Sequence, residues 1–187
     1  MAEEIFPTVS LEIDGIVLRP LTEADAAPIA TCCTDELIQR WLPLPNPYTL
    51  DDARQFCLEL APGQQASGNG VVFGIEVGGR LAGVIDLKRT DWRARTTEIG
   101  YWAAPWARGR GVIRRAVSRL SRWAIEDLGF VRVEIRVATE NVDSQRVAEA
   151  AGFVNEGVLR NAGYIHAGRV DLIVYSCIDA DLGGEGA

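Results

Sequence analysis

One short basic, glycine-rich stretch has the composition expected of a site for a small phosphorylated ligand. Arg108-Gly109-Arg110-Gly111-Val112 follows a strand-like run at 97–102 and opens a long amphipathic helix. N–H groups at a helix start favour an anion, helped by the positive end of the helix dipole, and glycine lets the backbone approach phosphate closely. Together with Arg114 and Arg115, the stretch forms a local basic spot on a chain of net charge −7. This combination indicates one small anionic ligand and not a long polyanion.

Two familiar phosphate-binding loops do not match this stretch. The P-loop requires a Lys-Ser/Thr pair after its last glycine, whereas Val112-Ile113 follows Gly111. The dinucleotide fingerprint requires a third glycine three residues after the second, and Arg114 occupies that position. Taken alone, the stretch also fits an ordinary helix start whose arginines lie in solvent. The neighbouring elements therefore decide its meaning.

Length and composition predict a single domain over residues 1–187. A hydrophobic content of 48% and a charged content of 24% are ordinary for a soluble globular protein. No apolar run reaches the ~18 residues of a membrane span, and the acidic start Met1-Ala2-Glu3-Glu4 lacks a signal-peptide pattern. We therefore expect a cytoplasmic protein with no membrane partner. The acidic balance argues against nucleic acid, and we expect 183–187 to be a disordered tail.

The cysteines and the single histidine fit no metal-binding pattern. Cys32, Cys33, Cys57 and Cys177 lack the spacing of metal ligands, and His166 alone adds little. We expect no metal, and we expect these thiols to be buried or half-buried in a reducing compartment.

The hydrophobic pattern predicts a mixed α/β order. Capping-box patterns begin a first helix expected over 22–40 and a second over 49–61, which Pro62-Gly63 should end. A third helix is expected over 111–128, and a fourth runs from Asn141 through Ala151.

Short β-rich segments fill the remainder of the chain. They lie at 9–18 around a turn at Asp14-Gly15, and at 71–77, 80–87, 97–102, 131–137, 154–160 and 170–178. Because the third helix connects 97–102 to 131–137 as a crossover, these two strands should run parallel. The sequence predicts an α/β fold with a mixed, mostly antiparallel sheet and about four helices.

This order of elements resembles the GNAT superfamily of acyl-coenzyme A-dependent N-acyltransferases over nearly the whole chain. Arg108 and Gly111 match the family pattern Arg/Gln-x-x-Gly-x-Gly/Ala, with Ile113 in place of the final small residue. Other segments are similar to the branch of ribosomal-protein N-terminal acetyltransferases, namely Pro47 to Ala53, Glu98 to Trp102, Asn141-Val142-Asp143-Ser144 and Ala150-Ala151-Gly152-Phe153.

The resemblance implies acetyl-coenzyme A as acyl donor. Its pyrophosphate would lie on the backbone of Gly109, Arg110, Gly111, Val112, Ile113 and Arg114, with Arg108 and Arg114 adding charge. In GNAT enzymes the strands that here carry Glu98 and Val133 splay apart, and pantetheine lies in the gap. Trp102-Ala103-Ala104 would supply its backbone hydrogen bonds, and Asn141 would contact the cofactor. The side chains of Trp102 and Trp106 are more typical of core residues.

The chemistry that the resemblance implies is attack of a neutral amine on a thioester. An alkyl ammonium of pKa ~10 must first lose a proton, and we expect Glu98 on the splayed strand to accept it, with Asp86 at the end of the preceding strand as the competing base. Ser144 matches the family position that donates to the departing thiolate. From the residues alone, Glu98 also fits a strand carboxylate paired with an arginine, and Asn141 and Ser144 also fit a helix cap and a first-turn serine. His166, in a glycine-flanked loop, is more typical of a solvated side chain.

Two function classes fit these observations. The first is an N-acetyltransferase that moves an acetyl group to a primary amine, either a protein N-terminus or a small amine, by direct attack in a ternary complex. An acidic protein attracts such a cationic acceptor. A transferase that uses another donor, such as succinyl-coenzyme A, is a variant of this class. The second class is a non-catalytic module that binds acyl-coenzyme A. The resemblance also allows a homodimer.

Overall fold

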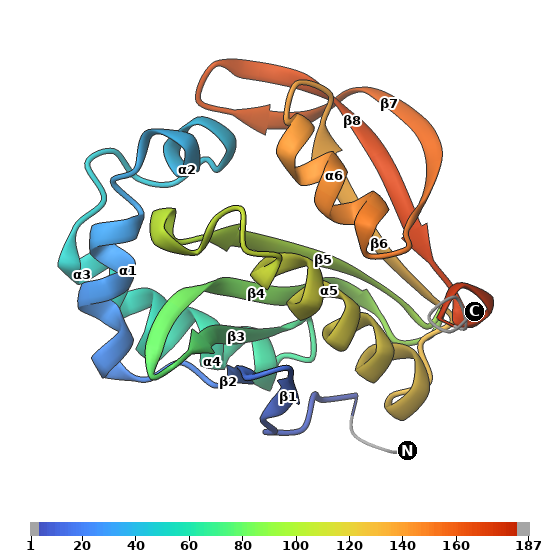
Figure 1. Cartoon of the computed structure of the whole chain (residues 1–187), viewed down its shortest axis with the longest axis horizontal. Helices are drawn as coiled ribbons and strands as arrows, with labels where there is room; N and C mark the ends of the chain where they lie inside the picture. The colour runs from blue at the N-terminus through green and yellow to red at the C-terminus, as the bar shows by residue number, and fades with distance from the viewer. Residues whose placement is uncertain (1–3, 183–187) are drawn as a thin grey trace.

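The described part of the chain forms one mixed sheet with helices on both faces (Figure 1). The computed structural model describes residues 4–182, so the tail expected to be disordered at 183–187 lies outside the described residues. The strand order is β1-β2-β3-β4-β5-β6-β8-β7. The strands are Leu11–Ile13 (β1), Ile16–Arg19 (β2), Val71–Val77 (β3), Arg80–Asp91 (β4), Thr96–Ala103 (β5), Arg132–Ala138 (β6), Val154–Ile165 (β7) and Gly168–Cys177 (β8).

Every strand pair in this sheet is antiparallel except β5 with β6. These two strands pair in parallel only at Thr96–Arg132, Thr97–Val133 and Glu98–Glu134. Beyond that point β5 stays paired with β4 and β6 stays paired with β8, while the two strands separate from each other (Figure 1). We call this opening the β5–β6 splay. It confirms the predicted mixed sheet with one parallel pair.

The helices are short, and two of them continue into π-helical turns. They are Ala26–Cys32 (α1), Glu36–Trp41 (α2), Leu50–Gln55 (α3), Ala61–Ala66 (α4), Val112–Arg122 (α5) and Val142–Ala150 (α6). A π-helical turn at Phe56–Leu60 joins α3 to α4, and another at Trp123–Asp127 extends α5. The crossover helix and the helix that begins after Asn141 are therefore confirmed.

Two predicted helix boundaries were wrong. The helix expected over 22–40 is broken between α1 and α2, because the Asp35 carboxylate turns to accept the N–H groups of Leu37 and Ile38. The second helix does not end at Pro62-Gly63 but continues to Ala66. Pro62 lies in the first turn of α4, directly after the π-helical turn, where its missing N–H is tolerated.

Strand alternation divides the interior into two cores. Ile85, Ile99 and Val133 point toward α5, where they join Val117 and Leu120 in the larger core. A smaller core lies on the opposite face, under α1, α3 and α4, and includes Val72 and Val84. The face of β6 opposite to α5 carries Arg132, Glu134 and Arg136. The β5–β6 splay therefore has a core side, covered by α5 and α6, and a charged side.

The close approach of β4 and β5 generates a stability prediction. A Cβ at Gly83 would overlap the carbonyl oxygen of Trp102, so Gly83→Ala should lower the free energy of unfolding by about 1–3 kcal/mol. Gly63 in α4 has open space around its Cβ position, so Gly63→Ala should raise that free energy by about 0.5–1 kcal/mol. Urea unfolding of both variants measures the pair. A Gly83→Ala variant as stable as the native protein would contradict the strand spacing described here.

Candidate active site

The Arg/Gly turn is an open backbone cradle. Gly109 and Gly111 both have φ of 69°, in the left-handed region that favours glycine. Gly111 is the N-cap of α5 and has no side chain to accept the N–H groups of the first helical turn. A Cβ built on either glycine meets no atom within 4 Å. The turn therefore presents backbone donors to open space, as the predicted pyrophosphate site requires.

Ile113 departs from the family pattern without obstructing this cradle. Its side chain is 8% exposed and belongs to the larger core, together with that of Val112. The bulk of the isoleucine is thus turned into the protein, while its backbone remains in the first turn of α5. The position can contribute an N–H group as a smaller residue would.

Arg108 contacts Asp35 and not the open side of the turn. Its guanidinium lies 2.5 Å and 3.3 Å from the two carboxylate oxygens of Asp35, and 3.3 Å from the Ala103 carbonyl oxygen. The hydrogen bond from Arg108 lowers the pKa of the Asp35 carboxyl. The positive charge that Arg108 was expected to offer to the pyrophosphate is therefore partly neutralised by Asp35, the N-cap residue of α2. By contrast, Arg110 is exposed, and its guanidinium lies 5.8 Å from the Trp106 ring centroid.

Ion pairs connect helix α2 to the segments that follow both separating strands, β5 and β6. Asp35 binds Arg108, which follows β5, and Arg40 forms an ion pair of 3.7 Å with Glu140, which follows β6. Two pairs of opposite charge therefore hold α2 near the ends of the separating strands.

The end of β5 offers only part of the backbone expected to meet pantetheine. The N–H of Ala104 donates to the Ala82 carbonyl oxygen at 2.8 Å, so it is already used. Trp102 packs against the smaller core, and Trp106 packs against the larger one with its indole N–H on the Leu81 carbonyl. The interpretation of these two side chains as core residues is confirmed. Trp102 and Ala103 remain the predicted backbone contacts.

Glu98 lies on the charged side of the splay and is held by three cations from two strands, β4 and β6. It is 7% exposed and forms ion pairs with Lys88 at 3.7 Å, Arg89 at 3.1 Å and Arg136 at 3.5 Å. This is the paired strand carboxylate that the sequence left open as an alternative. Its carboxylate oxygens are already engaged in these ion pairs.

Asp86 lies on the same side, opposite Gly100 in the β4–β5 register. Its Oδ1 is fully buried and has no hydrogen-bond partner among the described residues. A Cβ at Gly100 would overlap both this oxygen and Lys88 Nζ, so the side chains of Asp86 and Lys88 reach across the glycine. Burial raises the pKa of the Asp86 carboxyl, and Lys88 opposes the rise. Because Gly100 lies just beyond the last β5–β6 pair, Asp86 lies where the strands begin to separate.

Ser144 lies on the core side, in the first turn of α6. Asn141 Oδ1 accepts the Ser144 N–H at 3.2 Å, so the expected helix cap is confirmed. Ser144 Oγ lies 2.7 Å from the hydroxyl oxygen of Tyr101, which projects from β5 toward the larger core. Since Tyr101 and Gly100 are consecutive strand residues, Ser144 and Asp86 lie on opposite faces of β5.

The sequence missed Tyr101 and the cations around Glu98. The alternation of Ile99 and Tyr101 could have assigned Tyr101 to the core side, but its contact with Ser144 joins residues 43 positions apart. His166 is exposed in the turn between β7 and β8, as expected of a solvated side chain.

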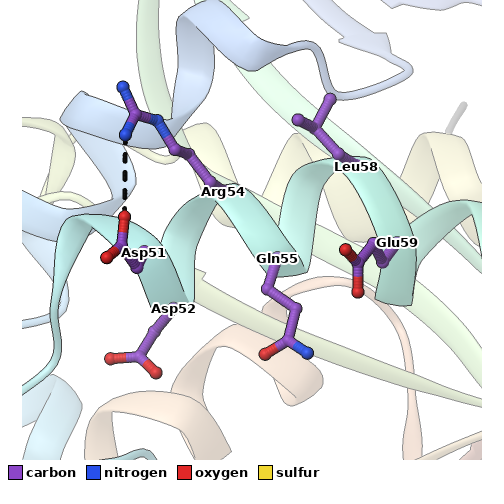
Figure 2. A pocket seen from close by; sticks show the side chains of 6 residues that line it. All are labelled: Asp51, Asp52, Arg54, Gln55, Leu58 and Glu59. Atoms are coloured by element: carbon purple, nitrogen blue, oxygen red, sulfur yellow. Dashed lines mark ion pairs between the residues drawn. The ribbon is translucent and has the colours of Figure 1, made fainter.

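One further depression in the described part of the chain lies outside the splay. The depression in Figure 2, about 350 Å³, is lined by Asp51, Asp52, Arg54, Gln55, Leu58 and Glu59, none of which belongs to β5, α5 or α6.

Within 4–182, no three His, Cys, Asp or Glu side chains gather in a way that could hold a metal ion. No helix in that range is long and apolar enough to cross a membrane. The four cysteines are free thiols, buried or half-buried as predicted.

Comparisons with known proteins identify the family and the fold. A family model described as an acetyltransferase (GNAT) domain matches residues 16–154. The putative ribosomal N-acetyltransferase YdaF of Bacillus subtilis (strain 168) is 34% identical over 175 residues, which are 92% of this chain and 96% of the relative. The ribosomal-protein-serine acetyltransferase of Escherichia coli (strain K12) is 32% identical over 98 residues, 52% of this chain and 55% of the relative.

Solved structures share the fold over almost the whole chain. A crystal structure described as a probable acetyltransferase superposes with a TM-score of 0.83 at 32% identity, covering 93% of this chain and 99% of the other. Mycobacterium smegmatis RimJ in complex with CoA-disulfide gives a TM-score of 0.84 at 22% identity, covering 94% of this chain and 88% of RimJ. At that identity the second match supports the fold alone.

The open cradle generates a binding prediction. Gly111→Asp adds a side chain and a negative charge where the pyrophosphate should lie, and it forces a non-glycine residue to φ of 69°. Affinity for acetyl-coenzyme A should fall by at least ~2 kcal/mol, the scale of a lost charge-assisted contact. Calorimetric titration measures the change.

Gly15→Asp is the matched control for this substitution. Gly15 has φ of 75° and open space around its Cβ position, but it lies in the β1–β2 turn, three strands from β5 in the sheet. It should carry the same backbone strain and leave the affinity for acetyl-coenzyme A unchanged. Equal affinities in a folded Gly111→Asp variant and the native protein would place the phosphates elsewhere.

Proposed function

Because the chain belongs to the GNAT family of acetyltransferases, and is thus an acyl-coenzyme A-dependent N-acyltransferase, we propose that it acetylates a primary amine by direct attack in a ternary complex. One observation carries this proposal: a buried carboxylate and a serine hydroxyl lie on opposite faces of β5, beside the β5–β6 splay. An amine that enters from the charged side can then reach a thioester held from the core side.

The donor-binding role falls to the turn before α5 and to the end of β5. Acetyl-coenzyme A, when bound, supplies an acetyl group on a reactive thioester. The backbone of Gly109 to Ile113 would hold its pyrophosphate, and the charges of Arg110 and Arg114 lie beside that backbone. The ion pair between Arg108 and Asp35 gives Arg108 a structural role, because it holds α2 next to the end of β5. Trp102 and Ala103 would border the pantetheine.

We assign proton acceptance from the amine to Asp86. Its buried, unpartnered Oδ1 and a pKa raised by burial suit a group that takes up a proton more readily than an ordinary aspartate. Glu98 is the alternative base, but its three cationic partners favour a role in fixing Lys88 and Arg136. On the other face, Ser144 would donate a hydrogen bond to the departing sulfur.

The acceptor that we favour is a protein N-terminus, with a small cationic amine as the second class. Two relatives carry names that refer to ribosomal proteins, and the net charge of −7 attracts either kind of amine. Release of coenzyme A thiol should be measured with peptides that begin in serine or alanine and with spermidine. No thiol release with any of them, in a protein that binds acetyl-coenzyme A, would favour the non-catalytic alternative.

Cytoplasmic location and a homodimer complete the proposal. The cytoplasmic location is supported by the four free thiols and by relatives that are named as ribosomal or ribosomal-protein acetyltransferases. The outer strand β7 exposes Val154, Val158 and Leu159, which supports the homodimer. Light scattering after size-exclusion chromatography would give the oligomeric state.

Asp86 generates a kinetic prediction. Asp86→Asn should lower kcat roughly 10²-fold, the usual range for a lost general base, without changing the affinity for acetyl-coenzyme A. Glu98→Gln is the comparison variant, and it should lower kcat much less. If Glu98→Gln gives the large loss and Asp86→Asn the small one, the base is Glu98.

The raised pKa of Asp86 also predicts a pH dependence. The carboxyl accepts a proton only when ionised, so kcat should rise with pH through a pKa above the ordinary aspartate value of 3.8. This acidic limb should be absent in Asp86→Asn. An unchanged limb in that variant would show that another group produces it.

A further inference from the structure

Tyr101 and Ser144 form an enclosed hydroxyl pair beside the splay. The Tyr101 hydroxyl oxygen lies 2.7 Å from Ser144 Oγ and 3.2 Å from the Ser144 carbonyl oxygen. Burial raises the pKa of Tyr101 to about 12, so the phenol keeps its proton near neutral pH. An enclosed hydroxyl requires a hydrogen-bond partner, and the Tyr101 hydroxyl makes both of its described hydrogen-bond contacts with Ser144.

The direction of this hydrogen bond decides what Ser144 can do. If Ser144 donates to Tyr101, its one proton is used within the pair. If Tyr101 donates, the Ser144 proton is free for another acceptor. The Ser144 carbonyl lies within α6, where it accepts the helical bond from residue 148. The carbonyl already has its helical partner and does not require the phenol proton, so Tyr101 can donate that proton to Ser144 Oγ.

The pair also connects β5 to the segment that follows β6, across the splay. Tyr101 projects from β5, whereas Ser144 belongs to the helix that follows β6. Asn141 holds the Ser144 N–H at 3.2 Å, so the cap fixes the Ser144 backbone while Tyr101 contacts its side chain. This arrangement leaves the orientation of the Ser144 proton as the remaining freedom.

We propose that Tyr101 is a positioning residue: it donates to Ser144 Oγ and thereby turns the Ser144 proton toward the departing sulfur. The proposal rests on the role assigned to Ser144 above. Tyr101 transfers no proton itself; it orients and polarises a hydroxyl whose hydrogen bond strengthens as negative charge develops on the sulfur.

A double-mutant cycle tests this assignment. The single-turnover rate of acetyl transfer to the best amine of the panel should fall about 5- to 20-fold in Tyr101→Phe, the effect of one lost hydrogen bond. Ser144→Ala should fall at least as far, and the double variant should be no slower than Ser144→Ala. If the two losses multiply, the residues act independently and the proposal is overturned.

Tyr175→Phe is the matched control. It also removes a hydrogen bond between a tyrosine and α6, the 3.0 Å contact with Glu149, but it does not touch Ser144. Its rate should be native. An equal loss in Tyr175→Phe would mean that Tyr101 only docks α6. A native rate in Tyr101→Phe together with a slow Ser144→Ala would reject the positioning role of Tyr101 and leave the role of Ser144 in place. A native rate in Ser144→Ala would reject the role of Ser144 itself.

A binding measurement gives a readout that is independent of turnover. A hydrogen bond aimed at the sulfur should favour the thiolate, so affinity for free coenzyme A should rise about three- to tenfold as pH passes through the thiol range near about 8.5. Acetyl-coenzyme A lacks the free thiol and corrects for other pH effects. Calorimetry should show the rise in the native protein and a flat response in Tyr101→Phe. A flat native response, or a full rise in Tyr101→Phe, contradicts the proposal.

Discussion

The end of pairing between β5 and β6 is the constraint on which the site depends. β5 stays paired with β4 and β6 stays paired with β8, but the facing edges of β5 and β6 are no longer paired with each other beyond Glu98 and Glu134. Backbone N–H and C=O groups on those edges still require partners. An extended ligand with amide groups, such as pantetheine, can supply them. Arg136 lies just past the last pair and forms ion pairs with both Glu98 and Glu134 at the point of separation.

Strand alternation turns this opening into a two-sided site. Consecutive residues of β5 face opposite sides, so Gly100 lies beneath Asp86 and Lys88 while Tyr101 reaches Ser144. On β6 the charged side carries Arg132, Glu134 and Arg136, and the core side is covered by α5 and α6. A cationic amine and a thioester can thus approach from different faces. In the proposed binding mode, the left-handed glycines of the Arg/Gly turn would hold the far end of the donor.

Local patterns in the sequence predicted the elements, because the period of apolar residues and the capping residues depend on neighbours along the chain. The parallel pair, the Asn141 cap and the glycine turn before α5 were predicted on this basis. Pairings between distant residues were not. The break before α2 depends on Asp35, which binds Arg108 73 positions away, and the partners of Glu98 come from β4 and β6. The buried oxygen of Asp86 likewise follows from packing across Gly100.

Hydrogen exchange with and without acetyl-coenzyme A tests the central claim most directly. If the donor occupies the β5–β6 splay and the turn before α5, its binding should slow exchange of the backbone amides at 99–103 and 110–113. Exchange in the β1–β2 hairpin, at the far edge of the sheet, should stay the same. Saturating acetyl-coenzyme A that leaves 99–103 unprotected would contradict the account, because the donor would then bind outside the splay.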